Sequence, residues 1–257
     1  MKRGVFSAIV LLCGISAFAQ AVVGNPFASK GELVAPIVHS AAVGDIIVNS
    51  PDAGQWEFDN ALQTLEDGKE LLTITMDAPC ECVPARFNVY FSFPQKGVFN
   101  LWSAYGKCST HLDPFWENPN QYSSLAQRMP LYEYFNDNEQ NCLTIALSDS
   151  FRRIDGKLGL LEESCEICSE FNFFVEPEAP LKHYQVQILL DSRPVFWAES
   201  IREASAWLMD VAGFKAFNVP SAALEPLYST WYQFHQGVTA PAVEAECRLA
   251  SEMGMKV

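Results

Sequence analysis

The chain has 257 residues, of which 49% are hydrophobic and 19% are charged, as in a typical globular protein somewhat larger than one average domain. Its formal net charge of −14 would repel the phosphate backbone of nucleic acids, so no nucleic-acid partner is expected. The 14 glycines, 15 prolines and 12% aromatic residues favour short extended segments and turns over a helical bundle, and predict a mainly β protein.

Segment 1–19 has the pattern of a secretory signal peptide. Lys2 and Arg3 precede an apolar run from Val5 to Ala19 that ends in a small-x-small pattern. This run is shorter than the roughly 18 residues of a membrane-spanning helix, and no second run of that length follows. We therefore expect a secreted or periplasmic protein without a membrane span. Cleavage would remove two positive charges and take the net charge to −16.

Six cysteines fall within one region of the chain. They are Cys80, Cys82, Cys108, Cys142, Cys165 and Cys168. An even number of cysteines in an exported domain is typical of disulfides, although the sequence does not choose their pairing. The short spacings Cys80-x-Cys82 and Cys165-x-x-Cys168 would also suit a structural zinc ion, and reduced cysteines often pack as small hydrophobic side chains. These three interpretations stay open, and no metal or cofactor is assigned.

Residues 20–198 are predicted to form a large antiparallel β-sandwich. From Phe87 to Phe93 every second residue is apolar, and polar residues fall between them. The same period of two recurs in Leu71–Met76 and in Tyr184–Ile188. Two packed sheets would bury the apolar faces of such strands.

Turn-forming residues interrupt this alternation at two clear places. Pro94–Gly97 lies between two predicted strands, and Asn136–Asn138 precedes the apolar run Leu143–Leu147. Both groups predict hairpins.

Residues 199–225 are predicted to form a helix and a linker. Ser200 is a candidate N-cap, apolar residues then recur at helical spacing, and Gly213 ends the segment. Phe217–Pro226 contains two prolines and little periodicity, which is typical of a linker.

Residues 226–257 have the pattern of a strand, a helix and the start of another strand. Leu227–Phe234 is rich in aromatic residues and predicts a strand, and Thr239 is a candidate N-cap with Pro241 in the first helical turn. Gly254 stands where a C-cap belongs, and Met255 would open the next strand. This order and length are those of a βαβ unit.

The segment Pro226–Gln236 reads PLYSTWYQFHQ and, with the helix after it, resembles the first strand and helix of the catalytic barrel in family 36 α-galactosidases. Upstream, Met129–Tyr132 and Leu143–Asp149 resemble the amino-terminal sandwich of that family more loosely. Together these segments extend the resemblance over most of the mature chain. It implies a supersandwich-like β-sandwich followed by the first βα unit of a truncated (β/α)8 barrel.

The resemblance also implies a function. Family 36 enzymes release terminal α-galactosyl groups with retention, using two aspartates from later barrel strands that this chain does not contain. A retaining mechanism needs two carboxyl groups on either side of one bond. We therefore expect the amino-terminal part of a secreted α-galactosidase-type glycoside hydrolase, inactive as this chain alone, and assign no catalytic residue.

The same resemblance places Trp231 and Tyr232 in the wall of a galactose subsite. The opposing interpretation is that Trp231 packs inside the barrel, since large aromatic residues are usually buried. The expected ligand is an α-galactoside or a related carbohydrate such as an α-N-acetylgalactosaminide, and a homo-oligomer is compatible with these features.

Two other functions are compatible with the predicted sandwich, one in binding and one in structure. A noncatalytic carbohydrate-binding sandwich would use Trp102, Tyr105 and Trp116 as a stacking platform. A purely structural sandwich would orient the barrel or mediate assembly.

Overall fold

The computed structural model describes residues 31–104, 112–117, 120–124, 127–215 and 217–255. The chain divides into two compact units, one ending at Gly213 and the other beginning at Phe214. The predicted signal peptide 1–19, Tyr105 and Cys108 lie outside the described residues. No helix in the described ranges is long and apolar enough to cross a membrane.

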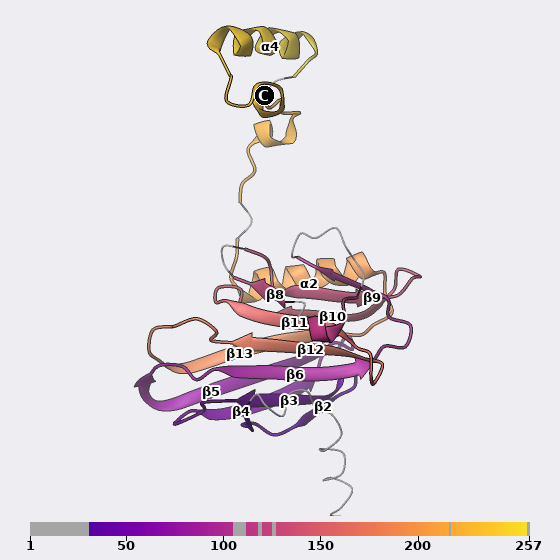
Figure 1. The fold of residues 1–257 in the computed structure, drawn as a ribbon, viewed down its shortest axis with the longest axis vertical. Helices are drawn as coiled ribbons and strands as arrows, with labels where there is room; N and C mark the ends of the chain where they lie inside the picture. The colour runs from indigo at the N-terminus through magenta and orange to yellow at the C-terminus, as the bar shows by residue number, and fades with distance from the viewer. Residues whose placement is uncertain (1–30, 105–111, 118–119, 125–126, 216, 256–257) are drawn as a thin grey trace, which may run out of the picture. The chain divides into compact units, whose positions relative to one another are not determined.

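The first unit is a sandwich of two antiparallel sheets, which confirms the predicted mainly β architecture (Figure 1). Within the described residues, the seven-stranded sheet has the order β1 (Glu32–Leu33), β3 (Gly44–Ser50), β6 (Phe87–Pro94), β12 (Glu166–Phe173), β11 (Ile154–Leu161) and β8 (Asn120–Ser123), with β2 (Val38–Ser40) also on β3. The six-stranded sheet has the order β4 (Glu57–Thr64), β5 (Glu70–Cys82), β13 (Leu181–Asp191), β10 (Asn141–Leu147), β9 (Leu131–Phe135) and β7 (Asn100–Ser103).

The core lies between the two sheets, and the predicted alternation identifies its residues correctly. The alternate residues of β6 that point inward are all buried: Phe87, Val89, Phe91 and Phe93. Aromatic rings meet across the sheets, with ring centroids 5.5 Å apart for Phe93 and Tyr134. The hydroxyl of Tyr134 lies 3.2 Å from Ser169 Oγ on the opposite sheet, so this buried hydroxyl has a partner.

The two predicted hairpins have different outcomes. Asn136–Asn138 joins β9 to β10, which pair antiparallel, so this hairpin is confirmed. Pro94–Gly97 is a turn, with Gly97 at φ 78°, but the strands on either side of it belong to different sheets. Turn residues reverse the chain without choosing the partner of the next strand, so the hairpin prediction at this position was wrong.

One helix, α2 (Trp197–Val211), packs across β9 and β10 (Figure 1). It begins three residues before the predicted cap Ser200, which is buried and directs its hydroxyl toward the sheet instead. Ala204 and Leu208 are buried against the six-stranded sheet, and Gly213 ends the segment at positive φ as predicted. This helix therefore covers part of the outer face of that sheet.

The second unit contains η2 (Ser221–Leu224), α3 (Trp231–Phe234) and α4 (Ala240–Glu252). The prediction of a strand over Leu227–Phe234 was wrong. The backbone amide of Phe234 donates to the carbonyl of Thr230, and that of His235 donates to the carbonyl of Trp231, so this segment closes a helical turn. A strand needs a neighbouring strand for its backbone hydrogen bonds, and the described part of this unit contains none. The start of a (β/α)8 barrel is thus not formed.

The predicted helix of this unit is present as α4. Thr239 is its extended N-cap, a proline lies in its first turn, and Gly254 follows it at φ 81°. No residue of α4 is buried, and neither is any other described residue of the second unit. The predicted strand that would begin at Met255 continues beyond the described residues.

Candidate functional site

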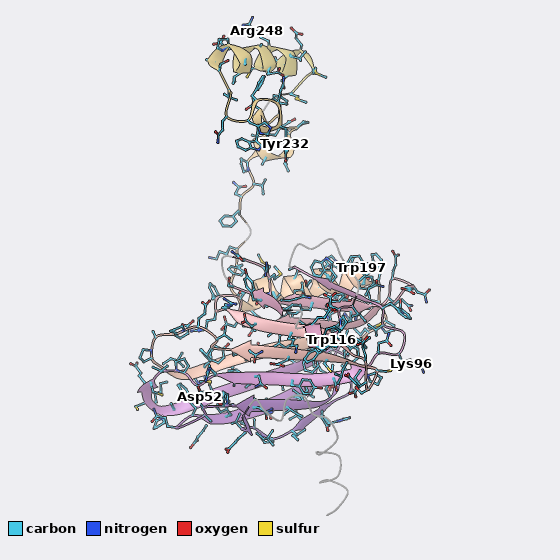
Figure 2. The ribbon with its side chains drawn as sticks, viewed as in Figure 1. Asp52, Lys96, Trp116, Trp197, Tyr232 and Arg248 are labelled. Carbon is cyan, nitrogen blue, oxygen red and sulfur yellow. The ribbon has the colours of Figure 1, made fainter. Side chains whose placement is uncertain are left out.

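Trp231 and Tyr232, the two predicted sugar-binding residues, lie next to each other on α3. Their side chains are 54% and 86% exposed. Tyr232 is labelled in Figure 2. Within the described part of the chain, neither the Trp231 indole nor the Tyr232 phenol makes a side-chain hydrogen bond, and the Trp231 ring contacts the His235 imidazole edge-on at 5.5 Å. The alternative, that Trp231 packs inside a barrel, stays a prediction because the described residues contain no barrel.

Gln233 connects α3 to its surroundings. Its carbonyl accepts a hydrogen bond from the Tyr228 hydroxyl, and its amide donates to Glu246 on α4 at 3.0 Å. These contacts hold the aromatic segment beside α4. Among the described residues, these contacts bring one carboxyl group, that of Glu246, to α3, and Trp231 and Tyr232 present exposed aromatic surface.

Two of the three residues of the predicted aromatic platform lie in the described ranges, at different sheets. Trp102 lies on β7 of the six-stranded sheet and packs with the cluster under α2. Trp116 lies on η1 (Phe115–Glu117), which contacts β11 of the other sheet, and its indole donates to Glu162 at 3.0 Å (Figure 2). Tyr105 lies outside the described residues, so the three-residue platform stays a prediction.

The described cysteines form no disulfide with one another. Cys80 and Cys82 end β5 of one sheet, whereas Cys165 and Cys168 lie at β12 of the other. Among the described residues no group of three or more His, Cys, Asp or Glu side chains could hold a metal ion. Cys168 is fully buried and lies 3.5 Å from the Tyr90 hydroxyl, and burial raises the pKa of its thiol to about 11.

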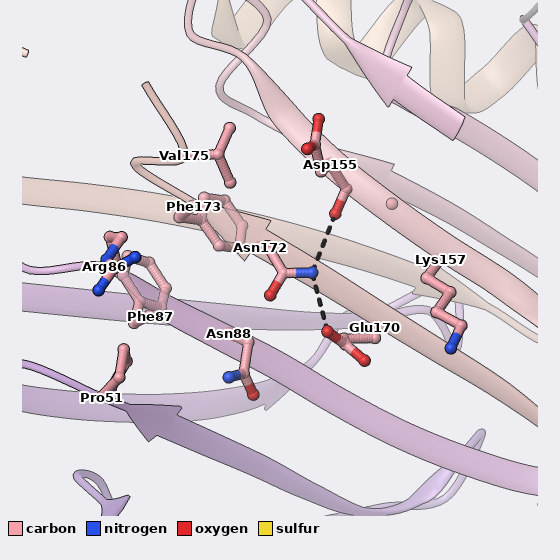
Figure 3. Close-up of a pocket in the computed structure, with 11 residues that line it drawn as sticks. Pro51, Arg86, Phe87, Asn88, Asp155, Lys157, Glu170, Asn172, Phe173 and Val175 are labelled. Carbon is pink, nitrogen blue, oxygen red and sulfur yellow. Dashed lines mark hydrogen bonds between the residues drawn. The ribbon is translucent and has the colours of Figure 1, made fainter. Parts of the chain in front are cut away.

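A polar cavity of about 410 Å³ lies on the seven-stranded sheet, across β6, β12 and β11 (Figure 3). The register places Asn88, Asn172 and Asp155 directly opposite one another on these three strands. Two residues along, Glu170 stands opposite Lys157. Because β6 alternates and buries Phe87 and its inward neighbours in the core, these polar residues point to the other face of the sheet.

The amide of Asn172 joins the two acidic residues of this cavity. Its Nδ2 donates to Glu170 Oε1 at 2.8 Å and to the backbone carbonyl of Asp155 at 3.4 Å, as the dashed lines in Figure 3 show. The carboxylate of Asp155 is itself bound by Arg153, whose Nε lies 2.8 Å from Oδ1. The acidic groups are thereby held in fixed positions along the sheet.

Asn88 contributes a buried amide to the lining of this cavity. It is only 3% exposed, and among the described residues its Oδ1 has no hydrogen-bond partner. A buried amide without a partner costs free energy, about 1–3 kcal/mol per group. Asn88 Oδ1 is thus a buried acceptor that the described residues leave unsatisfied.

Pro51, Phe87, Phe173 and Val175 supply the apolar part of the lining, and Arg86 stands at the same end (Figure 3). Arg86 is paired with Asp52 at 3.0 Å. The cavity therefore combines amides, paired charges and apolar surface, a lining that can orient a small neutral molecule.

Sequence reasoning missed this cavity. Asn88, Asp155 and Asn172 are single polar residues in alternating strands, a pattern that predicts only the wetter face of a sheet. Their alignment depends on the register between strands far apart in the sequence. Asp149, at the end of the segment Leu143–Asp149, is buried and accepts a hydrogen bond from the Tyr184 hydroxyl at 2.8 Å.

Comparisons with known proteins add little to this geometry. No family model and no curated protein match the sequence. Among solved structures, the chain is similar to a putative aldose 1-epimerase from Escherichia coli K12, with a TM-score of 0.37 and 10% identity over 64% of this chain and 69% of that one. A similarity this distant shows neither a family nor an activity.

Proposed function

We propose that this chain is the amino-terminal part of a retaining α-galactosidase-type glycoside hydrolase that acts on terminal α-galactosyl groups. The observation that carries the proposal is the segment PLYSTWYQFHQ at Pro226–Gln236, which resembles the start of the family 36 barrel. The antiparallel sandwich before it agrees with the order of domains that the resemblance implies.

The exposure of the second unit supports the same proposal. Its large apolar side chains remain in solvent: Leu227, Trp231, Leu249 and Met253 are 52–71% exposed, and Tyr232 is 86% exposed. A βα segment cannot bury its apolar faces alone and becomes stable when neighbouring strands and helices cover them. In the proposed enzyme, further barrel strands supply this cover and convert Leu227–Phe234 from a helical turn into the first strand.

The carboxylates of the described residues do not supply the chemistry themselves. The cavity on the seven-stranded sheet holds Asp155, which is bound by Arg153, and Glu170, which is fully buried and bonded to Asn172. A retaining glycosidase needs a free nucleophile and a separate acid on either side of the bond. We therefore assign the galactose subsite to Trp231 and Tyr232 and no catalytic role to this chain.

The test is hydrolysis of p-nitrophenyl α-galactoside by the product of the whole reading frame and by the 257-residue chain. We expect turnover by the former and none by the latter. The matching β-galactoside is the control substrate and should not be cleaved. Turnover by the 257-residue chain alone, or no α-galactoside turnover by the whole product, would refute the proposal.

The role of Trp231 has its own test in the active product. Trp231→Ala removes an aromatic surface that stacks on the sugar, worth about 1–3 kcal/mol, and should raise KM about tenfold or more. Trp207→Phe, on α2 of the sandwich, is the control and should leave KM unchanged. An unchanged KM in Trp231→Ala would remove this residue from the subsite.

A further inference from the structure

The cavity on the seven-stranded sheet carries an inference that is independent of the proposed enzyme. None of its lining residues belongs to the second unit. We infer that this cavity is a noncatalytic binding site for a neutral saccharide of one or two rings, with Asn88 as the central hydrogen-bonding residue.

Asn88 lies in the lining of this cavity. It is 3% exposed, and its Oδ1 has no partner within the described ranges. The inward neighbours of Asn88 on β6 are packed phenylalanine and valine, so an apolar residue at this position would be the more stable choice in the absence of a ligand. A hydroxyl group of a bound molecule would satisfy this acceptor once the Asn88 amide rotates toward the cavity, because Oδ1 itself is covered in the unliganded chain.

Hydrogen-bonding side chains of neighbouring strands are aligned in this cavity. Asn88, Asn172 and Asp155 form one row across three strands, and Asn49 on β3 continues it in register with Asn88. Adjacent strands lie about 4.8 Å apart, so the row presents polar groups at regular short intervals. Side-chain amides both donate and accept, as the hydroxyl groups of a saccharide do.

Among the described residues that line the cavity, the positive and negative side chains are equal in number. Arg86 and Asp155 are each compensated by a partner, Asp52 at 3.0 Å and Arg153 at 2.8 Å. Lys157 and Glu170 stand opposite each other in register and carry opposite charges. An anionic or cationic ligand would find no net countercharge in this lining, whereas a neutral polyhydroxylated ligand needs none.

The volume of the cavity and the apolar part of its lining also suit a small saccharide. A cavity of about 410 Å³ lies near the lower end of the range of about 300–1,000 Å³ for small-molecule sites, which suits one or two sugar rings. Pro51, Phe173 and Val175 supply apolar surface for the C–H faces of such a ring.

The test measures binding of galactose, glucose and melibiose to the full 257-residue chain by saturation-transfer NMR and by thermal unfolding. Inorganic phosphate and spermidine serve as charged probes. At least one sugar should raise the melting temperature with concentration, because a ligand that binds only the folded state stabilises it. Binding of the charged probes alone, or of no probe, would overturn the inference.

Variants then locate the site. Asn88→Leu should weaken sugar binding about tenfold or more, and should raise the melting temperature of the unliganded chain by about 2–4 °C because it removes an unsatisfied buried acceptor. Asn172→Leu should also weaken binding about tenfold. Gln63→Leu, at an exposed position on β4 of the other sheet, is the matched control and should change neither property.

The thermal readout separates a binding role for Asn88 from a structural one. A structural asparagine would lower the melting temperature when replaced, whereas an asparagine retained for a ligand raises it or leaves it unchanged. Sugar binding that is equal in the parent chain and in Asn88→Leu and Asn172→Leu would place the ligand elsewhere and overturn the inference.

Discussion

Glu133 is a fully buried carboxyl group between the six-stranded sheet and α2. It lies beside the Thr144 hydroxyl, and its Oε1 is 3.1 Å from Ser200 Oγ on the helix. Burial raises the pKa of this carboxyl to about 8, although the two hydroxyl groups partly offset that effect. The neutral acid is therefore the form that the folded state prefers at pH 7.

This preference predicts a dependence of stability on pH. Between about pH 4.5 and pH 8 the folded state holds a proton that the unfolded state has released, so the free energy of unfolding falls as pH rises, by at most about 1.4 kcal/mol per pH unit from this group. Below this window the contribution of Glu133 is fully present, and above it the loss is complete. Glu133→Gln stays neutral and should lose this slope, as urea unfolding from pH 5 to pH 9 would measure.

The matched control for this measurement is Glu199→Gln, at an exposed position on α2, the helix that packs over Glu133. It should leave the pH profile of the parent chain unchanged. Equal slopes for Glu133→Gln and the parent chain would show that Glu133 is ionised in the folded protein.

At the scale of single elements, α2 is held to the sandwich by a small apolar cluster. Leu208 is 2% exposed and packs with Leu131, Ala146 and Leu189 of the sheet. Leu208→Ala should lower the free energy of unfolding by about 2–5 kcal/mol, because it removes buried methyl groups and leaves a cavity.

Val211→Ala, at a 41% exposed position on α2, is the control and should cost less than about 0.5 kcal/mol. Denaturant unfolding of the two variants measures the difference. Equal and small effects would mean that Leu208 is not packed on the sheet.

Individual strands of the sandwich could be predicted because their signal is local. In β6 the alternation from Phe87 to Phe93 identifies the buried face directly, since side chains in a strand point to opposite faces in turn. The pairing of β6 with β12 and β3 was not predictable, because partners and register depend on residues far away in sequence. The cavity row of Asn88, Asn172 and Asp155 depends on that register, which is why it was missed.

The prediction of a strand over Leu227–Phe234 was wrong for a related reason. Aromatic residues favour a strand only where a neighbouring strand accepts its hydrogen bonds and covers its side chains. In this structure Trp231 and Tyr232 remain exposed and the backbone satisfies itself in one helical turn. The helix α4 could be predicted because Thr239, Pro241 and Gly254 mark its ends locally.

At the scale of the whole molecule, the two units should differ strongly in stability. The sandwich has an extensive buried core, whereas the described residues 217–255 include none that is buried. Helices shorter than about 12–15 residues are marginal without packed partners. In the 257-residue chain, amides of Ala240–Glu252 should exchange with deuterium within seconds to minutes, and those of β6 and β12 should be protected far longer.

Mass spectrometry of peptides from the two units gives this comparison in one experiment. The peptides of the sandwich are the internal control. Slow exchange throughout α4, equal to that of β6, would show that the second unit is already packed in this chain and would weaken its interpretation as a barrel segment.

The anomeric form of the first product tests the central claim most directly. Proton NMR of an α-galactoside during hydrolysis by the product of the whole reading frame should show α-galactose first, since two displacements at one carbon retain its configuration. β-Galactose as the first product, or no release of galactose, would contradict the account of this chain as part of a retaining α-galactosidase.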